Sequence, residues 1–178
     1  MSESASAPVT ATAFVPRRWV VMHAAGQDIA IDALSVREIH DGWQAMPLPG
    51  TAAWFLGTLV VRGRVVPVTS FDAWLDPEGG RRAPPFGVEV TVGGDAYLLA
   101  VSDVRHAMDA SPDREADRDA DRDAEPAARS PAPAGSPGAL AGRGVRVERR
   151  TIGGLEMDTF TAGALIAAPA FGDVTASR

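Results

Sequence analysis

The chain has 178 residues, of which 17 are basic and 23 are acidic, and its formal net charge is −6. It contains no cysteine, which excludes a disulfide framework and any thiolate metal site. Every basic residue is an arginine, and neither lysine nor asparagine occurs, a bias typical of GC-rich bacterial coding.

The acidic charge is concentrated in residues 113–125, which hold seven acids and three arginines and leave a charge of only −2 for the rest of the chain. A nearly neutral folded part is not typical of a nucleic-acid-binding protein, which needs a clustered basic face. No apolar run approaches the roughly 20 residues of a membrane span. The N-terminus also lacks the basic and apolar regions of a signal peptide. We therefore expect a cytoplasmic protein.

The first predicted elements form a hairpin. Residues 18–23 and 29–32 are mostly apolar and flank a Gly26-Gln27-Asp28 turn, a pattern that predicts two paired strands. Residues 33–40 are expected to continue as a bend or a short helical turn. Residues 46–50 contain two closely spaced prolines, which exclude both a helix and a central strand.

A second hairpin is predicted over residues 56–68, where two apolar runs flank an Arg62-Gly63-Arg64 turn. Apolar residues occupy nearly every position of these runs rather than alternate positions. We therefore expect both faces of the two strands to be covered. Ser70 is predicted to cap a short helix that packs Phe71 and Trp74 inward.

The remaining elements surround an insertion. Residues 87–92 and 96–101 predict a third hairpin, and strands are expected at residues 145–152 and 155–158. The segment between them, residues 109–143, combines acidic tetrads with a stretch of Pro, Ala, Gly and Ser. Such a composition predicts a disordered insertion with no core of its own.

An internal similarity links two distant parts of the chain. Residues 68–75 and 157–165 share one order of features: a strand, a hydroxyl residue, a phenylalanine and a short helix. This repeat predicts two topologically similar halves, each a small β-barrel with a helix after its last hairpin.

An ordered set of short motifs carries a resemblance to a known family. It consists of Val36-Arg37-Glu38-Ile39, Pro49-Gly50, Gly57, Val60-Val61-Arg62-Gly63 and Pro67-Val68. Together these motifs resemble the CheW-like domain, the adaptor fold of bacterial chemosensory arrays. Trp54, with Val61-Arg62-Gly63-Arg64, is most similar to the adaptors of type IV pilus (twitching) chemosensory systems.

The resemblance implies a mainly β fold of two small SH3-like five-stranded β-barrel subdomains with short helices. It places a single CheW-like domain at residues 17–169, with a disordered lead at 1–16 and a tail at 170–178. The family implies a non-enzymatic scaffold without cofactors or metals. Its partners would be the regulatory domain of a CheA-type histidine kinase and the cytoplasmic tip of a methyl-accepting chemoreceptor, at membrane-associated receptor arrays.

In the family, an apolar groove between the two barrels receives the receptor tip. The resemblance places the partner-binding positions of this chain at Val36, Glu38, Ile39, Leu56, Gly57, Val61, Arg62 and Gly63. Each apolar position among them also fits a core residue, because apolar strand residues are usually buried. Gly57 differs, since a glycine within a strand marks close approach of another backbone.

Glu38 and Arg62 carry opposite charges on segments that flank apolar runs, so we expect them to form an ion pair. Two interpretations stay open: a purely structural pair, or an Arg62 that also lies on the receptor-binding face.

The sequence offers little for catalysis. His23, His40 and His106 lie apart, with no pair at metal-ligand spacing, and Ser70 fits a helix cap better than a nucleophile. A small hydrolase would need a clustered base and nucleophile. An oligonucleotide-binding small barrel, the other alternative, would need a basic groove with stacking aromatic residues.

Overall fold

The computed structural model describes residues 18–78, 84–109 and 138–172. The predicted N-terminal lead and most of the predicted insertion and tail lie outside these residues. The described chain forms two five-stranded sheets and a few short helices, which confirms the predicted mainly β fold class.

The first sheet has the strand order β8-β1-β2-β10-β9. Its strands are β1 (Arg18–Ala24), β2 (Gln27–Asp32), β8 (Asp103–Asp109), β9 (Glu148–Ile152) and β10 (Leu155–Phe160). The second sheet has the order β3-β6-β7-β5-β4. Its strands are β3 (Val36–Asp41), β4 (Phe55–Val61), β5 (Arg64–Ser70), β6 (Phe86–Val92) and β7 (Asp95–Val101).

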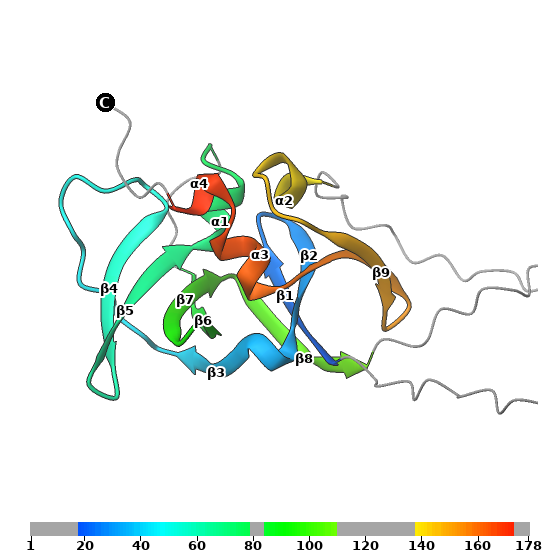
Figure 1. The fold of residues 1–178 in the computed structure, drawn as a ribbon, viewed down its shortest axis with the longest axis horizontal. Helices are drawn as coiled ribbons and strands as arrows, with labels where there is room; N and C mark the ends of the chain where they lie inside the picture. The colour runs from blue at the N-terminus through cyan, green and yellow to red at the C-terminus, as the bar shows by residue number, and fades with distance from the viewer. Residues whose placement is uncertain (1–17, 79–83, 110–137, 173–178) are drawn as a thin grey trace, which may run out of the picture.

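Short helices connect and cover the sheets. They are η1 (Ala33–Ser35), α1 (Phe71–Leu75), α2 (Ala139–Gly142), α3 (Ala162–Ile166) and α4 (Pro169–Gly172). Figure 1 shows β3 to β7 on the left of the molecule, β1, β2, β8 and β9 on the right, and α3 between the two groups. The bend or short helical turn expected over residues 33–40 is confirmed only at its start, as η1. Residues 36–40 belong instead to the strand β3, which pairs with β6.

The predicted hairpin at Arg62-Gly63 is a two-residue turn. Val61 pairs with Arg64, and both central residues have positive φ, 49° at Arg62 and 77° at Gly63. Positive φ at both positions is the signature of a type I′ turn, whose twist matches that of the strands. Arg62 therefore adopts a conformation unusual for a side-chain-bearing residue, at the tip of this hairpin.

The predicted internal similarity is confirmed in three dimensions. β5 pairs in parallel with β7 and leads into α1, while β10 pairs in parallel with β2 and leads into α3. Ser70 Oγ accepts a hydrogen bond from Ala73 N at 3.3 Å, and Thr161 Oγ1 accepts one from Ala164 N at 3.2 Å. The two units are not consecutive halves of the sequence, however, because β1 and β2 join β8, β9 and β10 in one sheet.

The main core lies between the two sheets. It contains Met22 and Ile31 from the first sheet and Val88 and Leu99 from the second, all almost completely buried. Trp74 of α1 is also buried there. One core thus joins both units, which supports the prediction of a single domain.

A polar link also connects the units. Asp72 Oδ1 on α1 accepts hydrogen bonds from the Ala25 backbone N–H in the β1–β2 turn and from Ser102 Oγ after β7, each at 2.8 Å. Hydrogen bonds to a carboxylate are stronger than neutral ones. Asp72 therefore fixes α1 against a turn of the first sheet.

The second sheet is rolled so that its two edges approach each other. β3 and β4 are the outermost strands in its order. The segment that leaves β3 nevertheless pairs with β4, because Met46 N donates to Thr58 O at 2.7 Å and Thr58 N donates to Met46 O at 2.9 Å. This bridge covers the edge of β4 and gives the sheet the barrel-like closure that the resemblance implies.

Gly57 makes this closure possible. Its φ is +125°, and a Cβ placed on it would lie 1.9 Å from the Met46 carbonyl oxygen. The expectation that this glycine marks close backbone approach is therefore confirmed. Gly57 is buried and has no side chain, so the residue acts on the shape of the sheet.

The expectation that both faces of the β4–β5 hairpin are covered is wrong at its tip. Val60 and Val65 pair with each other there and remain 67% and 69% exposed, whereas Val66 and Val68 are buried. The hairpin extends beyond the neighbouring strand, since β7 pairs with β5 only at residues 68–70. A continuous apolar run thus does not distinguish a covered strand from an exposed apolar tip.

Other differences concern the boundaries of the predicted insertion and tail. Residues 139–142 fall within the insertion but form α2, with Leu140 fully buried in the main core. Residues 170–172 fall within the tail but belong to α4, with Phe171 buried. Both segments have few charges and many small residues, and an apolar side chain in each packs on the core. The strand β8, which pairs with β1, was not predicted.

Replacing Ser70 by alanine should remove the N-terminal cap of α1 and lower the free energy of unfolding by about 1 kcal/mol. The Ser70 hydroxyl is buried, so in the variant no water would replace it as the hydrogen-bond acceptor of the Ala73 N–H. Urea denaturation of Ser70→Ala beside Thr161→Ala, whose cap is exposed, checks this. An equal or larger loss for Thr161→Ala would contradict it.

Candidate functional site

The predicted ion pair between Glu38 and Arg62 is confirmed. Arg62 Nη2 lies 2.8 Å from Glu38 Oε2, so a β3 side chain binds a residue of the β4–β5 turn. Their side chains are 38% and 61% exposed. The pair is therefore a surface contact, which is worth at most about 1 kcal/mol. The main effect of the pair is to orient the exposed guanidinium of Arg62.

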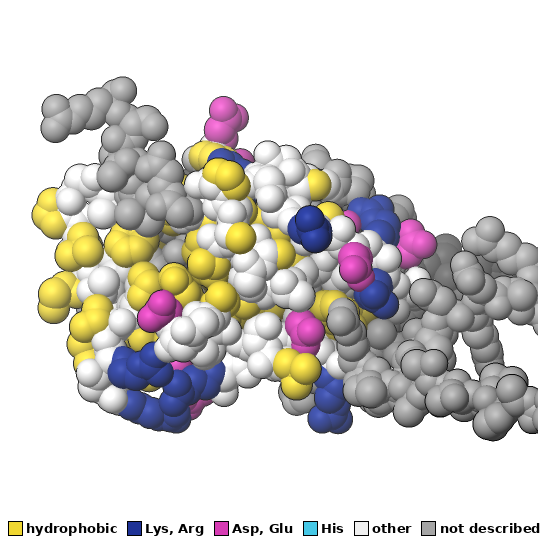
Figure 2. Space-filling model, viewed as in Figure 1, with side chains coloured by type: hydrophobic (Ala, Val, Ile, Leu, Met, Phe, Trp, Pro, Cys, Tyr) yellow, Lys and Arg dark blue, Asp and Glu magenta, His cyan; other side chains and the backbone are white. Residues whose placement is uncertain are grey.

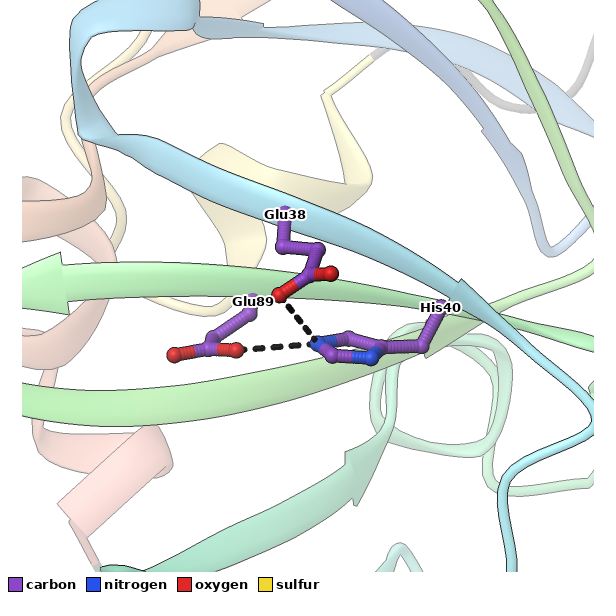
Figure 3. Close-up of side chains that lie close together, drawn as sticks. All are labelled: Glu38, His40 and Glu89. Atoms are coloured by element: carbon purple, nitrogen blue, oxygen red, sulfur yellow. Dashed lines mark hydrogen bonds and ion pairs between the residues drawn. The ribbon is translucent and has the colours of Figure 1, made fainter. Parts of the chain in front are cut away.

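A buried carboxylate lies directly behind this pair. Glu89 on β6 is the register partner of Glu38, and its side chain is only 3% exposed. His40 Nε2 lies 2.9 Å from Glu89 Oε2 and 4.0 Å from Glu38 Oε2, and Figure 3 shows the imidazole ring pointing between the two carboxylates. Arg37 Nε lies 3.6 Å from Glu89 Oε1. These five residues, Arg37, Glu38, His40, Arg62 and Glu89, form one ionic network.

Sequence reasoning missed Glu89 and assigned His40 no specific neighbour. The only signal was a single acidic residue within an otherwise apolar strand, between Val88 and Val90, which are fully buried. A lone glutamate in such a strand requires a partner, because an unpaired buried charge is costly. The sequence did not indicate which strand would provide that partner.

The proposed partner-binding positions differ in exposure. Ile39, Arg62 and Gly63 are exposed, whereas Val36, Glu38, Leu56 and Val61 are half-buried, and Gly57 is buried. Val36 packs against the main core. Leu56 and Val61 pack against a smaller cluster within the second sheet. The positions that offer side chains to a partner are thus concentrated at the β4–β5 turn and on β3.

Exposed apolar side chains lie on β4, on β5 and in the segment before them. These side chains are Met46, Leu48, Val60 and Val65. Figure 2 shows hydrophobic side chains gathered where β4 and β5 lie, with basic side chains grouped near the lower end of this hairpin. An exposed apolar surface beside charges is typical of a protein-binding site.

A pocket of about 470 Å³ opens on the same sheet. Its lining is mainly apolar and includes Trp43, Pro47, Leu56 and Pro85. The indole Nε1 of Trp43 is buried without a hydrogen-bond partner. Trp43 packs against the cluster formed by Val66, Val68 and their neighbours.

The candidate catalytic residues have structural partners. His23 Nδ1 pairs with Asp28 Oδ1 at 2.8 Å, and Ser70 Oγ caps α1. The side chain of His106 lies outside the described residues. The longest helices in the described ranges have five residues, far too few to span a bilayer.

A family model described as "CheW-like domain" matches residues 18–127, more than half of the chain. The chain belongs to the CheW-like domain family. The match ends before β9 and β10, which complete the first sheet in the structure. The family assignment confirms the resemblance carried by the motifs around Glu38 and Arg62.

One curated relative and one solved structure are similar to this chain. The "Chemotaxis protein CheW" of Rhizobium meliloti (strain 1021) is 32% identical over 59 residues, which are 33% of this chain and 38% of that protein. The matched segment therefore spans well under half of that relative. A crystal structure of the scaffolding protein TtCheW from Thermoanaerobacter tengcongensis has a TM-score of 0.56 and 16% identity, covering 82% of this chain and 88% of its own. This likeness supports the CheW-like fold across both sheets.

Proposed function

We propose that this protein is a chemosensory adaptor that couples methyl-accepting receptors to a CheA-type histidine kinase. The observation that carries the proposal is the placement of the family's motif residues. Glu38 and Arg62 are joined at the surface of a CheW-like fold, beside exposed apolar side chains. Membership of the family supports both classes of partner.

The mechanism is binding without catalysis. Receptor contacts would involve the exposed Ile39 and Arg62, with Val61 and Gly63 beside them, while Gly57 maintains the curvature of the sheet beneath. A second surface would hold the regulatory domain of the kinase. The single core between the two sheets makes the adaptor rigid, so both partners are held in a fixed relative geometry.

Replacing Arg62 by glutamate should weaken binding to a peptide of the receptor cytoplasmic tip by at least about tenfold. The change places a like charge beside Glu38 and reverses the charge that a partner meets. Because this exposed pair is worth at most about 1 kcal/mol, we expect the melting temperature to stay within about 4 °C of the wild type. Isothermal titration calorimetry and differential scanning calorimetry measure the two quantities.

Arg105→Glu is the matched control. Arg105 on β8 is also an exposed arginine in an ion pair, with Asp28 at 3.0 Å, but it lies on the first sheet. Receptor binding should survive in this variant. Unchanged receptor binding by Arg62→Glu, or equal losses in both variants, would contradict the assigned surface. Failure of the wild type to co-elute with both kinase regulatory domain and receptor tip would overturn the adaptor proposal itself.

We assign the receptor class to type IV pilus systems, on the basis of Trp54 and the Val61-Arg62-Gly63-Arg64 turn. Trp54 is half-buried and stacks on Phe171 with ring centroids 6.0 Å apart, so its role is to pack α4 against the segment before β4. A pilus-type receptor and kinase encoded by neighbouring genes would support this assignment. Flagellar partners there would overturn it.

Single-stranded DNA should not bind to this protein when it is tested in the same binding assay. Arg62, Arg105, Arg149 and Arg150 each form an ion pair with a carboxylate in the structure. Such paired arginines contribute little to phosphate binding, which depends on clustered positive charge. Tight retention of DNA would favour the alternative of an oligonucleotide-binding barrel.

A further inference from the structure

We propose that Glu38, His40 and Glu89 form a binding site for a divalent transition-metal ion, with Zn²⁺ as its best fit. Two carboxylates and one imidazole each offer one donor atom, and these three atoms lie within 4.8 Å of one another. The site shares Glu38 with the proposed partner-binding surface, but metal binding can be measured without any partner protein.

The sheet itself brings the three donors together. Glu38 and His40 are two residues apart on β3, so their side chains lie on the same face of the strand. Glu89 is directly opposite Glu38 on the antiparallel neighbour β6, where side chains of register partners are about 5 Å apart at Cβ. Strand pairing, rather than a flexible loop, therefore sets the spacing of the donors.

The distances suit a small cation. Donor atoms bound to tetrahedral Zn²⁺ at about 2.0–2.1 Å lie roughly 3.3 Å from one another. The observed separations from His40 Nε2, 2.9 Å to Glu89 and 4.0 Å to Glu38, lie on either side of this value. Glu38 is the more exposed carboxylate, so its side chain can close the remaining distance.

The environment distinguishes this site from an ordinary acidic surface cluster. Glu89 is almost completely buried, and its Oε2 points at Nε2 of the His40 imidazole. Its other oxygen faces Arg37 Nε only at 3.6 Å, longer than a hydrogen bond. The charge of a buried carboxylate with so few close partners is stabilised by a nearby cation. Glu38 is partly exposed, so a metal ion can reach the site from solvent.

The donor chemistry selects the class of metal. Imidazole with carboxylates suits Zn²⁺, Co²⁺ and Ni²⁺, whereas Mg²⁺ and Ca²⁺ prefer oxygen donors alone. Coordination needs the lone pair of Nε2, so the metal binds the His40 tautomer that carries its proton on Nδ1. Any proton on Nε2 moves to Nδ1 or is released to solvent.

Arg62 competes with the metal for the Glu38 carboxylate, because Arg62 Nη2 lies 2.8 Å from Glu38 Oε2 and Glu38 is one of the three donors. Removing an exposed pair worth up to about 1 kcal/mol should therefore tighten metal binding, so Arg62→Ala should bind Zn²⁺ up to about fivefold more tightly. Conversely, a bound metal would weaken the hold on Arg62 and release its guanidinium at the surface.

The test uses the full-length protein without a histidine tag. Titration with Co²⁺, followed by its visible absorption spectrum and by competition with Zn²⁺, measures affinity. His40→Ala removes a ligand and Glu89→Gln replaces a charged ligand by a neutral amide oxygen. Because the loss of an outer-shell partner alone costs about 10–100-fold, each variant should weaken binding by about 100-fold. His23→Ala is the matched control and should bind as the wild type does, because His23 pairs with Asp28 elsewhere.

Two outcomes would overturn the proposal. One is Co²⁺ or Zn²⁺ binding that is equal in the wild type and His40→Ala, which would assign the metal to other acidic residues such as those of 113–125. The other is the absence of binding by the wild type at millimolar metal. If Glu89→Gln fails to fold, the partly exposed His40 still provides a decisive variant, with circular dichroism as the check on folding.

Discussion

Replacing Gly57 by alanine should lower the free energy of unfolding by about 3 kcal/mol or more. The new methyl group would overlap the Met46 carbonyl oxygen at 1.9 Å and the Pro47 Cα at 2.8 Å, both backbone atoms that cannot rotate away. The φ of +125° adds strain for any residue with a Cβ, about 1–3 kcal/mol. The two hydrogen bonds between Met46 and Thr58 would also be disturbed.

Gly63→Ala is the control for this effect. Gly63 also has positive φ, but nothing lies within 4 Å of a Cβ placed on it. This variant should lose only about 1 kcal/mol, the cost of the left-handed conformation. Guanidinium chloride denaturation measures the free energy of unfolding of both variants. The loss in Gly63→Ala reports backbone strain alone, and the additional loss in Gly57→Ala reports the steric clash. Similar losses at the two positions would contradict the close approach that closes the second sheet.

Replacing Trp74 by alanine should cost about 3–5 kcal/mol, the range for removing a large aromatic side chain from a core. Trp74 is completely buried between the sheets and stacks on Phe71 with ring centroids 5.5 Å apart. It also meets Phe171 of α4 edge-on at 5.5 Å and lies beneath the Arg143 guanidinium at 5.8 Å. Its removal would leave a cavity at the point where both units meet.

Thermal denaturation of Trp74→Ala should therefore show a melting temperature lowered by about 6 °C or more, at 2–4 °C per kcal/mol. Trp43→Ala provides a matched comparison, because Trp43 is only half-buried and its indole N–H forms no hydrogen bond. We expect less than half of the loss there. A loss at Trp43 equal to that at Trp74 would place the main stabilising core within the second sheet instead of between the sheets.

These two stability effects differ from the effect of Arg62→Glu on binding. Gly57 and Trp74 act through the shape and packing of the fold, and their replacement should disturb every partner surface together. Arg62 lies at an exposed turn and forms an ion pair with the half-buried Glu38. Its replacement should affect one surface and leave the fold intact.

Much of the fold could be predicted because its signals are local. The hairpin turns near glycine, the Ser70 cap and the inward Phe71 and Trp74 each depend on a few consecutive residues. The predicted Gly26-Gln27-Asp28 turn is displaced, since the structure turns at Ala25-Gly26 and places Gln27 in β2. The strand β8 was missed because its sequence mixes charged and apolar residues, and only its pairing with β1 stabilises it as a strand. The helix α2 was missed because its four residues are too few to show a helical period, whereas burial of Leu140 defines its place.

The sequence by itself determined the family motifs, the mainly β class and the Glu38–Arg62 pair. The pair could be expected because opposite charges next to apolar runs stabilise each other when they lie close together. Only the tertiary structure decided that this pair lies at the surface and that Glu89 is the buried charge. It also placed His40 between the two carboxylates, and it left the tip of the β4–β5 hairpin exposed. The physical reason is that burial and cross-strand register arise from contacts between residues about 50 positions apart, which no local pattern records.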